Sequence, residues 1–322
     1  MDTIPTRRLG SDGPVVGAVG LGCMGMTWAY NPADRDDERS AAAIHRALDE
    51  GVTLIDTADV YGPFTNEDLV GRALADRRVE AVLATKCGLV VRLDDSDRGF
   101  TMTTDGRPEH VRAAVDASLA RLGTDHVDLY QLHRVDPDVP IAETWGAMAE
   151  TVAAGKALAV GLSEVTVEQA EEAHAIHPVA SVQSELSLWT RDHLPVVEWC
   201  REHGATFIPF SPLGRGFLTG NVSRAAFDPK DFRSHNPRFT AEAVDANQTL
   251  AAVVVEVARR VGATPAQVAL AWVLARGQHI VPIPGSTRPE RVAENAGAAR
   301  LPLSDADLAE LDDVPIATGS RY

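Results

Sequence analysis

Residues 108–134 read PEHVRAAVDASLARLGTDHVDLYQLHR, and they combine a helix pattern with a strand pattern. Pro108 fits the first position of a helix, and Gly123 fits the position just after its last turn. Between them, small and apolar residues recur from Val111 at i, i+3, i+4, i+7, i+8 and i+11, which places them on one face. The run Val127–Leu132 is short and largely apolar, as is typical of a parallel strand covered by helices. The segment therefore predicts a helix packed against a parallel sheet.

The same order of a short β-rich run and then a helix pattern repeats along the chain. Further helices are predicted at 40–50, 141–154 and 195–203, and another begins at Thr264-Pro265, an N-cap residue followed by proline. The predicted strands are Val15–Leu21, Thr53–Asp56, Ala81–Lys86, Val127–Leu132, Ala157–Leu162, Ala180–Gln183, Thr206–Pro209 and Ile280–Ile283. Eight such repeats in 322 residues favour an α/β fold of the (β/α)8 TIM barrel type over an open sheet. We expect a single domain, residues 1–322, with large loops after strands 1, 3, 4 and 7 and a C-terminal tail.

The charge balance of the chain is acidic. Lysine and arginine number 30 against 46 aspartates and glutamates, a formal net charge of −16. Such a surface repels phosphate backbones and anionic lipids, so we expect neither nucleic acid nor a membrane as a partner. No apolar run reaches the ~20 residues of a membrane span, and the first eight residues lack the apolar core of a signal peptide. The expected partner is a small molecule, and the sequence leaves the oligomeric state open.

The three cysteines, Cys23, Cys87 and Cys200, are sparse and form no C-x-x-C pair. This pattern excludes a disulfide-built fold and a cysteine-based zinc site, and it favours a cytoplasmic protein. His174 and His177 are three residues apart, but no third ligand is evident, and the other histidines show no spacing typical of a metal site. We therefore expect no metal.

Chemically versatile side chains follow three neighbouring predicted strands, where the active sites of (β/α)8 barrels lie. Asp56 ends the second strand and Tyr61 follows it, Lys86 ends the third, and His133 follows the fourth. A nearby ammonium lowers the pKa of a phenol, a carboxylate keeps that ammonium charged, and a histidine can orient a substrate oxygen. Each residue alone has an ordinary structural role, as a cap, a packing residue or a surface charge. Together the four residues favour a general acid whose pKa is adjusted by its neighbours and which protonates an oxygen.

The run Gly51–Gly62, GVTLIDTADVYG, resembles the signature of the aldo-keto reductase superfamily. Further matches follow in the same order, at Thr85-Lys86, Gly106–Glu109, Asp128–His133, Gly161–Ser163, Gln183, Phe210–Gly220 and Ile283–Asn295. The resemblance spans Arg8 to about Leu311, and it is strongest toward microbial and plant NADPH-dependent reductases of the pyridoxal-reductase and perakine-reductase kind. It implies a (β/α)8 barrel, the cofactor NADPH and the reduction of an aldehyde or ketone to an alcohol.

For catalysis, the resemblance implies that Tyr61 is the general acid, that Lys86 paired with Asp56 lowers the Tyr61 pKa, and that His133 helps to position the carbonyl. Two other functions stay open. Potassium-channel β-subunits resemble aldo-keto reductases, so the chain could be a nucleotide-binding regulatory module with a weakly active or silent site. Lys86 could instead form a Schiff base in a barrel lyase, although a lysine held charged by a carboxylate is a poor nucleophile.

For the cofactor, the resemblance implies that Ser163 and Gln183 hold the nicotinamide carboxamide and that Phe210 stacks on the ring. The loop 211–216 would line the pyrophosphate, and residues 285–295 would bind the adenosine end. The expected cofactor-binding residues are Gly22, Met24, Ser163, Glu164, Gln183, Phe210, Ser211, Pro212, Leu213, Gly214, Arg215, Gly216, Gly285, Ser286, Thr287, Arg288, Arg291, Glu294 and Asn295.

Two positions depart from many relatives: Glu164 stands where they carry asparagine, and Thr287 where they carry a lysine near the adenosine phosphate. An anion site at this end also follows without the family. Arg288 and Arg291 stand beside Ser286 at the start of the final helix pattern, and a helix N-terminus favours anions. The same residues could simply form a solvated helix start.

The run Gly20–Gly25, GLGCMG, fits the G-x-G-x-x-G pattern of dinucleotide-binding folds. That fold needs a helix to open at the third glycine, and no helical stripe is evident until about Ser40. We therefore expect these glycines to let the first strand and its loop approach a ligand closely.

The substrate itself cannot be identified from the sequence. Its pocket is expected to be lined by the loops after strands 1, 4 and 7 and by the C-terminal tail, where sequences diverge most. Trp28 and Tyr30 favour a flat or apolar substrate, or they pack the loop. The expected lining residues are Trp28, Tyr30, Phe64 and Arg134, with Trp189 as a further candidate.

Overall fold

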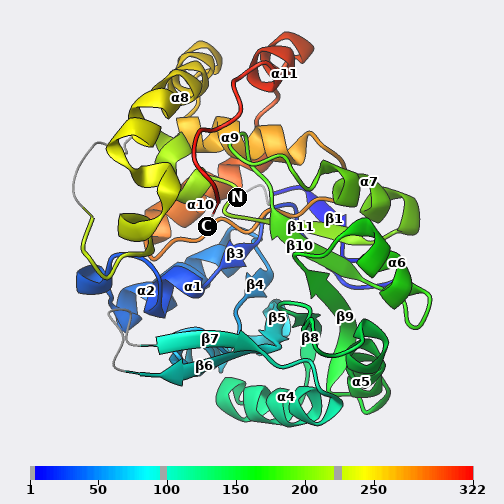
Figure 1. The fold of residues 1–322 in the computed structure, drawn as a ribbon. Helices are drawn as coiled ribbons and strands as arrows, with labels where there is room; N and C mark the ends of the chain where they lie inside the picture. Colours follow the sequence, from blue (N-terminus) through cyan, green and yellow to red (C-terminus); the bar gives the residue numbers. More distant parts are fainter. Residues whose placement is uncertain (1–3, 95–99, 221–226, 322) are drawn as a thin grey trace.

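The centre of the molecule is a curled parallel sheet. The computed structural model describes residues 4–94, 100–220 and 227–321. Seven strands lie in the order β11, β10, β9, β8, β5, β4, β3 around a common axis (Figure 1). They are β3 (Leu21–Gly22), β4 (Leu54–Asp56), β5 (Val82–Cys87), β8 (Val127–Leu132), β9 (Ala157–Ser163), β10 (Ser181–Glu185) and β11 (Thr206–Phe210). Six of the predicted strands agree with these bounds to within two residues at each end.

The eighth place in the barrel is taken by the backbone of Ile280–Ile283, which lies between β11 and the approach to β3. Val281 donates a backbone hydrogen bond to Phe207 O at 2.9 Å, and Gly20 donates one to Pro282 O at 2.9 Å. The prediction of a regular strand here is wrong, because proline has no N–H to donate and only isolated bridges form. These bonds nearly close the sheet, and the expected single-domain α/β barrel is confirmed.

The apolar run Val15–Leu21 serves two elements, so its prediction as one barrel strand is wrong. β2 (Val15–Gly17) pairs antiparallel with β1 (Thr6–Arg8), and only β3 enters the barrel sheet. The hairpin buries Leu9 and Val16 against side chains of the barrel strands. One half of the run is apolar because it packs in the hairpin, and the other because it lies in the barrel sheet. The hydrophobicity of the sequence alone does not distinguish these two environments.

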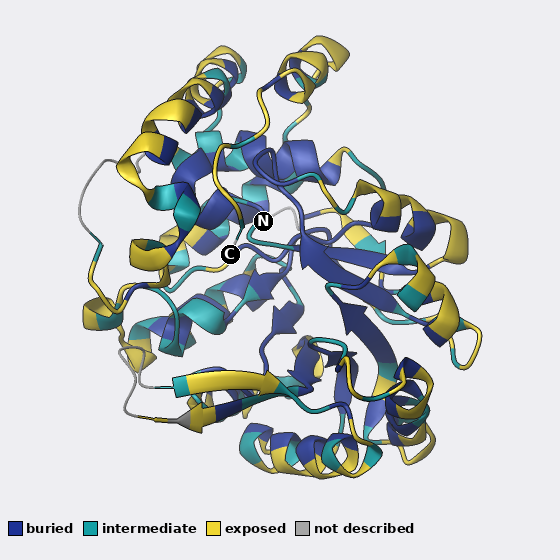
Figure 2. Cartoon of the chain, in the orientation of Figure 1, coloured by how far each residue is buried: buried dark blue, intermediate teal, exposed yellow. Residues whose placement is uncertain are grey.

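Helices surround the barrel with their buried faces toward the strands and their exposed faces outward (Figure 2). They are α2 (Asp37–Asp49), α3 (Thr65–Leu74), α4 (Pro108–Leu122), α5 (Ile141–Ala153), α6 (Val167–His174), α7 (Leu194–His203), α8 (Ala241–Val261), α9 (Pro265–Leu274), α10 (Pro289–Gly297) and α11 (Asp305–Asp312). The prediction for α4 is confirmed at both ends. α2 begins three residues before the predicted Ser40, because Asp36 caps it by accepting a hydrogen bond from Arg39 N at 2.9 Å. Thr264 caps α9 as predicted.

The loop after β3 forms a short helix, α1 (Met24–Thr27), so the expectation of no helix before Ser40 is wrong. The turn closes because Met26 donates a backbone hydrogen bond to Cys23 O at 3.0 Å. Four residues are too few for the helix of a dinucleotide-binding βαβ unit, and the strand order is that of a barrel. The Gly20–Gly25 pattern therefore does not mark that fold.

The remaining segments lie outside the barrel sheet. They are the hairpin β6 (Leu89–Leu93) with β7 (Phe100–Thr104) and the 3-10 turns η1 (Pro32–Asp34), η2 (Arg78–Glu80), η3 (Gly214–Thr219), η4 (Phe232–His235), η5 (Pro237–Phe239) and η6 (Ala298–Arg300). The C-terminal tail, residues 313–321, runs back from α11 to the barrel beside β10 and β11 (Figure 1). In the part of the chain that the structure describes, no helix is both long and apolar enough to cross a membrane.

Candidate active site

A buried ion pair lies at the carboxyl ends of β4 and β5. Lys86 is fully buried, and its Nζ donates hydrogen bonds to Asp56 Oδ1 at 2.5 Å and to Thr57 O at 2.7 Å. A charged lysine in such a site needs a partner, because burial without one costs several kcal/mol. The pair satisfies that need, and it places a fixed positive charge at the mouth of the barrel.

The second oxygen of Asp56 is also held. Gln183 Nε2 donates to Asp56 Oδ2 at 2.8 Å, and Gln131 Nε2 donates to the same atom at 3.2 Å. We call Asp56, Lys86, Gln131 and Gln183 the Lys86 network. Gln131 is absent from the sequence-based site. The sequence did indicate Gln131, because it lies two residues before His133 and alternate residues of a strand point to the same face.

Tyr61 packs beside this network in the loop after β4. Its ring centroid lies 5.3 Å from Lys86 Nζ and 5.8 Å from the His133 ring centroid. Gly62 follows with a φ of +94°, where a Cβ atom would come within 2.1 Å of Thr65 Oγ1. Only glycine fits that turn, so the sequence fixes how Tyr61 enters the site. The four residues expected to be catalytic thus lie together.

Burial dominates the protonation of this site. Burial raises the Tyr61 pKa above its ordinary value, and the Lys86 charge opposes that rise without outweighing it. The net direction is thus the reverse of the expected lowering, although the contribution of Lys86 has the expected sign. Burial by itself lowers the Lys86 pKa, but Asp56 and Tyr61 outweigh it, and the pKa lies above its ordinary value. Tyr61 therefore holds a proton, and Lys86 holds its charge, at neutral pH.

His133 is the neutral member of the site. Burial first, and then the charges of Lys86 and Arg134, hold its pKa well below the ordinary value. Among the described residues, its buried Nδ1 has no hydrogen-bond partner. A neutral imidazole with an unused nitrogen can donate to, or accept from, a bound oxygen atom.

Several residues expected at the nicotinamide end lie at the same carboxyl end of the barrel. Ser163 ends β9, and its Oγ accepts a hydrogen bond from Arg134 at 3.3 Å. Gln183 faces Asp56, as described above, and Phe210 ends β11 half-buried. Met24 packs on the apolar cluster that contains Tyr61. Ser163, Gln183 and Phe210 lie in strands, so the barrel itself sets their spacing, whereas Met24 lies in α1.

The loop 211–216 has the backbone of an anion-binding loop. Positive φ values occur at Ser211 (49°), Gly214 (57°), Arg215 (55°) and Gly216 (96°). Such turns can aim successive N–H groups into one concavity that suits an anion. Pro212 and Leu213 connect these turns. The feature fits a pyrophosphate without requiring a side-chain charge.

The residues expected at the adenosine end gather at the start of α10. Arg288 is its N-cap residue, and Arg288 N donates to Ser286 Oγ at 3.1 Å. Arg288 and Arg291 are exposed, and the Arg288 guanidinium lies 3.8 Å from Asp34. The backbone of Gly285 bridges to Gly22 at the end of β3, and the other residues expected here are Thr287, Glu294 and Asn295, of which Asn295 is buried.

The comparisons with known proteins agree with this architecture. Residues 18–316 match the family described as the Aldo/keto reductase family. The chain belongs to that family. It is 43% identical over 321 residues to a probable aldo-keto reductase 1 of Glycine max, with 98% of this chain and 91% of that protein covered.

Two solved structures resemble this chain along nearly their whole length. A glycerol dehydrogenase from Gluconobacter oxydans superposes with a TM-score of 0.87 at 29% identity, covering 98% of this chain and 99% of that one. A thermostable aldo-keto reductase in complex with the inhibitor epalrestat gives a TM-score of 0.77 at 29% identity, covering 96% and 99%.

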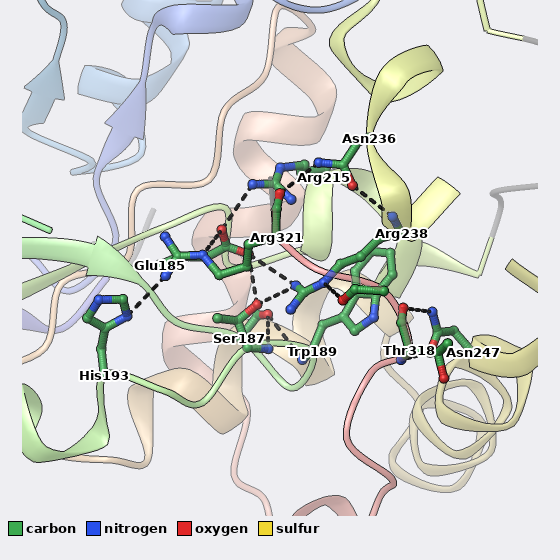
Figure 3. Close-up of polar contacts among 12 residues, drawn as sticks. Glu185, Ser187, Trp189, His193, Arg215, Asn236, Arg238, Asn247, Thr318 and Arg321 are labelled. Atoms are coloured by element: carbon green, nitrogen blue, oxygen red, sulfur yellow. Dashed lines mark hydrogen bonds and ion pairs between the residues drawn. The ribbon is translucent and has the colours of Figure 1, made fainter. Parts of the chain in front are cut away.

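A second buried charge network, drawn in Figure 3, lies at the end of β10. Glu185 is fully buried; its carboxylate lies 3.0 Å from Arg215, 3.5 Å from Arg238 and 3.3 Å from Arg321. Arg321 also pairs with Glu164. We call these five residues the Glu185 cluster. Sequence reasoning found Glu164 and Arg215 but missed the other three, because they are charged residues without a local motif.

The residues expected to line the substrate pocket divide into two groups. The Trp28 ring centroid lies 5.9 Å from that of Tyr61 and 5.4 Å from that of Phe100 in the β6–β7 hairpin. Arg134 contacts Ser163, as described above. Phe64 is instead exposed, with Arg121 5.4 Å from its ring. The structure therefore brings Trp28 and Arg134 to the site, adds Phe100, and places Phe64 against α4.

Two further aromatic residues pack against loops of the protein. The Tyr30 ring lies 5.3 Å from the Arg233 guanidinium. Trp189 is buried against Phe217, with ring centroids 4.4 Å apart. Among the described residues, no group of three histidine, cysteine, aspartate or glutamate side chains is arranged to hold a metal ion.

Proposed function

We propose that the protein converts an aldehyde or ketone to an alcohol with NADPH, and that Tyr61 is the general acid. The observation that carries the proposal is the buried Lys86–Asp56 pair beside a protonated Tyr61 and a neutral His133. The cofactor would supply the hydride, which is the hard part of the chemistry. The barrel supplies position, a proton and fixed charge.

Each catalytic side chain then has one task. Tyr61 donates its hydroxyl proton to the oxygen of the carbonyl as that oxygen gains negative charge. Lys86 stabilises the phenolate left behind, since a neighbouring ammonium favours the charged form of a phenol. Asp56 holds Lys86 in place and charged. His133 orients the carbonyl oxygen by a hydrogen bond from its neutral ring.

The residues present also fit the proposed cofactor. The positive-φ turns of the loop 211–216 suit the pyrophosphate, and Ser163, Glu164 and Gln183 suit the nicotinamide end. Arg288 and Arg291 suit a 2′-phosphate, because a guanidinium binds phosphate oxygens with two parallel hydrogen bonds. We therefore propose NADPH over NADH. The other cofactor contacts proposed are Gly22, Met24, Phe210, Gly285, Ser286, Thr287, Glu294 and Asn295.

We also propose that the protein is an NADPH-dependent reductase of the pyridoxal-reductase and perakine-reductase kind. Trp28 and Phe100 flank Tyr61 and favour a carbonyl compound with a flat or apolar body. Arg134 donates a hydrogen bond to Ser163, which we place at the nicotinamide end. Its guanidinium is therefore placed to bind a polar group of such a compound.

Initial rates of NADPH consumption test the proposal, measured with aldehydes, ketones, pyridoxal and keto-sugars. We expect NADPH oxidation that depends on the added carbonyl and forms the alcohol in equal amount. Cofactor binding without turnover for any member of the panel would favour a regulatory nucleotide-binding module. Trapping of a substrate on Lys86 by borohydride would instead indicate a Schiff-base lyase.

A further inference from the structure

We propose that Arg321, in the C-terminal tail, sets the relative affinity of the site for NADPH and NADP⁺ by balancing the charge of Glu164. This inference rests on the proposed function, which places the nicotinamide beside Ser163 and Gln183. It concerns the one position at that end where the sequence departs from many relatives and carries a carboxylate.

The Glu164 carboxylate is fixed in place. Glu164 N donates to Gln183 O at 3.0 Å, and Glu164 Oε1 accepts a hydrogen bond from Glu185 N at 3.0 Å. Its φ of 54° lies in the left-handed region, which a non-glycine residue occupies only when its surroundings hold it there. Burial would raise its pKa, but the Glu185 N–H, Arg321 and His193 outweigh burial, and the pKa lies below its ordinary value. The site therefore keeps a negative charge next to Ser163.

Arg321 reaches this carboxylate from the end of the chain. Its Nη2 pairs with Glu164 Oε2, and its Nε lies 3.3 Å from Glu185 Oε2. The Arg321 side chain is only 14% exposed, so water screens the pair weakly. Glu185 has two further arginines, as Figure 3 shows, whereas the second ion-pair contact of Glu164 is the longer one to His193, at 3.8 Å. Loss of the Arg321 charge would therefore leave Glu164 without an arginine partner, whereas Glu185 would keep two.

The tail is also held by uncharged contacts that do not depend on this pair. Thr318 N donates to Asn247 Oδ1 at 2.8 Å, and Asn247 Nδ2 donates to Thr318 O at 3.1 Å. Asn236 Nδ2 donates to Arg321 O at 2.8 Å. The position of the tail and the charge of Arg321 can therefore be changed separately.

The charge matters because the two forms of the cofactor differ at the ring. The nicotinamide is a cation in NADP⁺ and neutral in NADPH. An unbalanced carboxylate beside it stabilises the oxidised form, whereas a paired carboxylate favours neither strongly. A reductase that must bind NADPH and release NADP⁺ gains from such pairing. One unit of charge in a partly buried site changes this ratio roughly tenfold.

Fluorescence titrations of the protein with NADPH and with NADP⁺ test the proposal. We expect Arg321→Met to shift the ratio of the two dissociation constants roughly tenfold toward NADP⁺, and Arg321→Lys to keep it near that of the wild type. Asn247→Ala is the matched control, because it loosens the tail without altering charge, and it should change both affinities alike. An equal change of both affinities in Arg321→Met would overturn the proposal.

A second variant keeps the test independent of how well Arg321→Met folds. Glu164→Gln should shift the ratio in the opposite direction, toward NADPH, and an unchanged or reversed ratio would overturn the proposal. Combined with Arg321→Met, it should return the ratio to near the wild-type value. A wild-type protein that binds both cofactor forms but gives unshifted variants contradicts this inference alone. A wild-type protein that binds neither form contradicts the proposed function as well.

Discussion

The Lys86 network and the Glu185 cluster are both buried at the carboxyl end of the barrel, yet they are built in opposite ways. The Lys86 network pairs one cation with one anion, and its members come from β4, β5, β8 and β10. The Glu185 cluster brings three arginines to two carboxylates, and its arginines come from loops and the tail. Strands give the first a fixed geometry suited to chemistry. In the second, the ion pairs join loops and the tail to the end of β10.

The largest expected effect tests the chemical side of this comparison. Tyr61→Phe should keep NADPH binding and lower kcat/KM for carbonyl reduction by about 10²–10⁴-fold, the usual contribution of a general acid. The ring still packs against Trp28 and His133, but the proton is gone. Tyr30→Phe is the control, because Tyr30 packs against Arg233 in a loop. A Tyr61→Phe enzyme with more than about a tenth of wild-type kcat/KM, at a rate limited by chemistry, would exclude Tyr61 as the acid.

Lys86→Met addresses the charge in the Lys86 network. The Tyr61 pKa is already raised by burial, and Lys86 opposes that rise, so removal of the ammonium should raise it further. The pH–rate profile should move to higher pH, with a loss of activity of about tenfold or more at neutral pH. Breaking a buried pair typically also costs about 3–5 kcal/mol of stability.

Lys156→Met provides the matched control for that change. Lys156 pairs with Asp116 at the surface, where side chains are 36% and 58% exposed, and such pairs contribute about 0–1 kcal/mol. Its pH–rate profile should match the wild type. An unshifted profile for Lys86→Met, at near-normal rate, would show that the lysine does not act on Tyr61.

Glu185→Gln probes the other network. Its three arginines would lose a shared carboxylate in a buried site, so we expect a loss of unfolding free energy of about 3–5 kcal/mol and faster proteolysis of the tail. The midpoint of the pH–rate profile should stay at its wild-type value, because the cluster does not touch Tyr61. Glu150→Gln, from an exposed pair with Arg112, should change neither property. A shifted midpoint in Glu185→Gln would mean that the two networks are coupled.

The same contrast explains what the sequence predicts well. The residues of the proposed catalytic site follow or end short apolar runs, and the barrel brings strand ends together, so the grouping of Asp56, Tyr61, Lys86 and His133 is predicted from their places in the chain. The helix Pro108–Leu122 is likewise predicted because its cap, stripe and stop are all local.

The errors arise where contacts are not local. The Glu185 cluster joins positions from Glu164 to Arg321, and nothing near either residue marks the pairing. The run Val15–Leu21 divides between a hairpin and a barrel strand because both environments bury apolar side chains. The raised Tyr61 pKa depends on how deeply the ring is buried, which only the packed structure determines.

The smallest expected effect concerns a third charged region, which unlike the two networks is exposed. Arg288 and Arg291 stand at the start of α10, where the 2′-phosphate of NADPH would add up to two negative charges that NADH lacks. Part of Arg288 faces Asp34, so Arg291 should carry more of the discrimination. We expect Arg291→Ala to weaken NADPH binding roughly tenfold and NADH binding little, since one charge-assisted contact is lost.

Salt should separate this region from the buried networks. Salt screens interactions between exposed charges much more than interactions between buried ones, so the preference for NADPH should shrink as ionic strength rises. Fluorescence titrations of both cofactors at two salt concentrations measure this, with Arg300→Ala beyond the other end of α10 as the control for net charge. Equal wild-type affinities for the two cofactors, or equal losses in Arg291→Ala, would mean that this arginine does not recognise the phosphate. A preference that is independent of salt would instead indicate a phosphate contact from a buried group, as in the two networks.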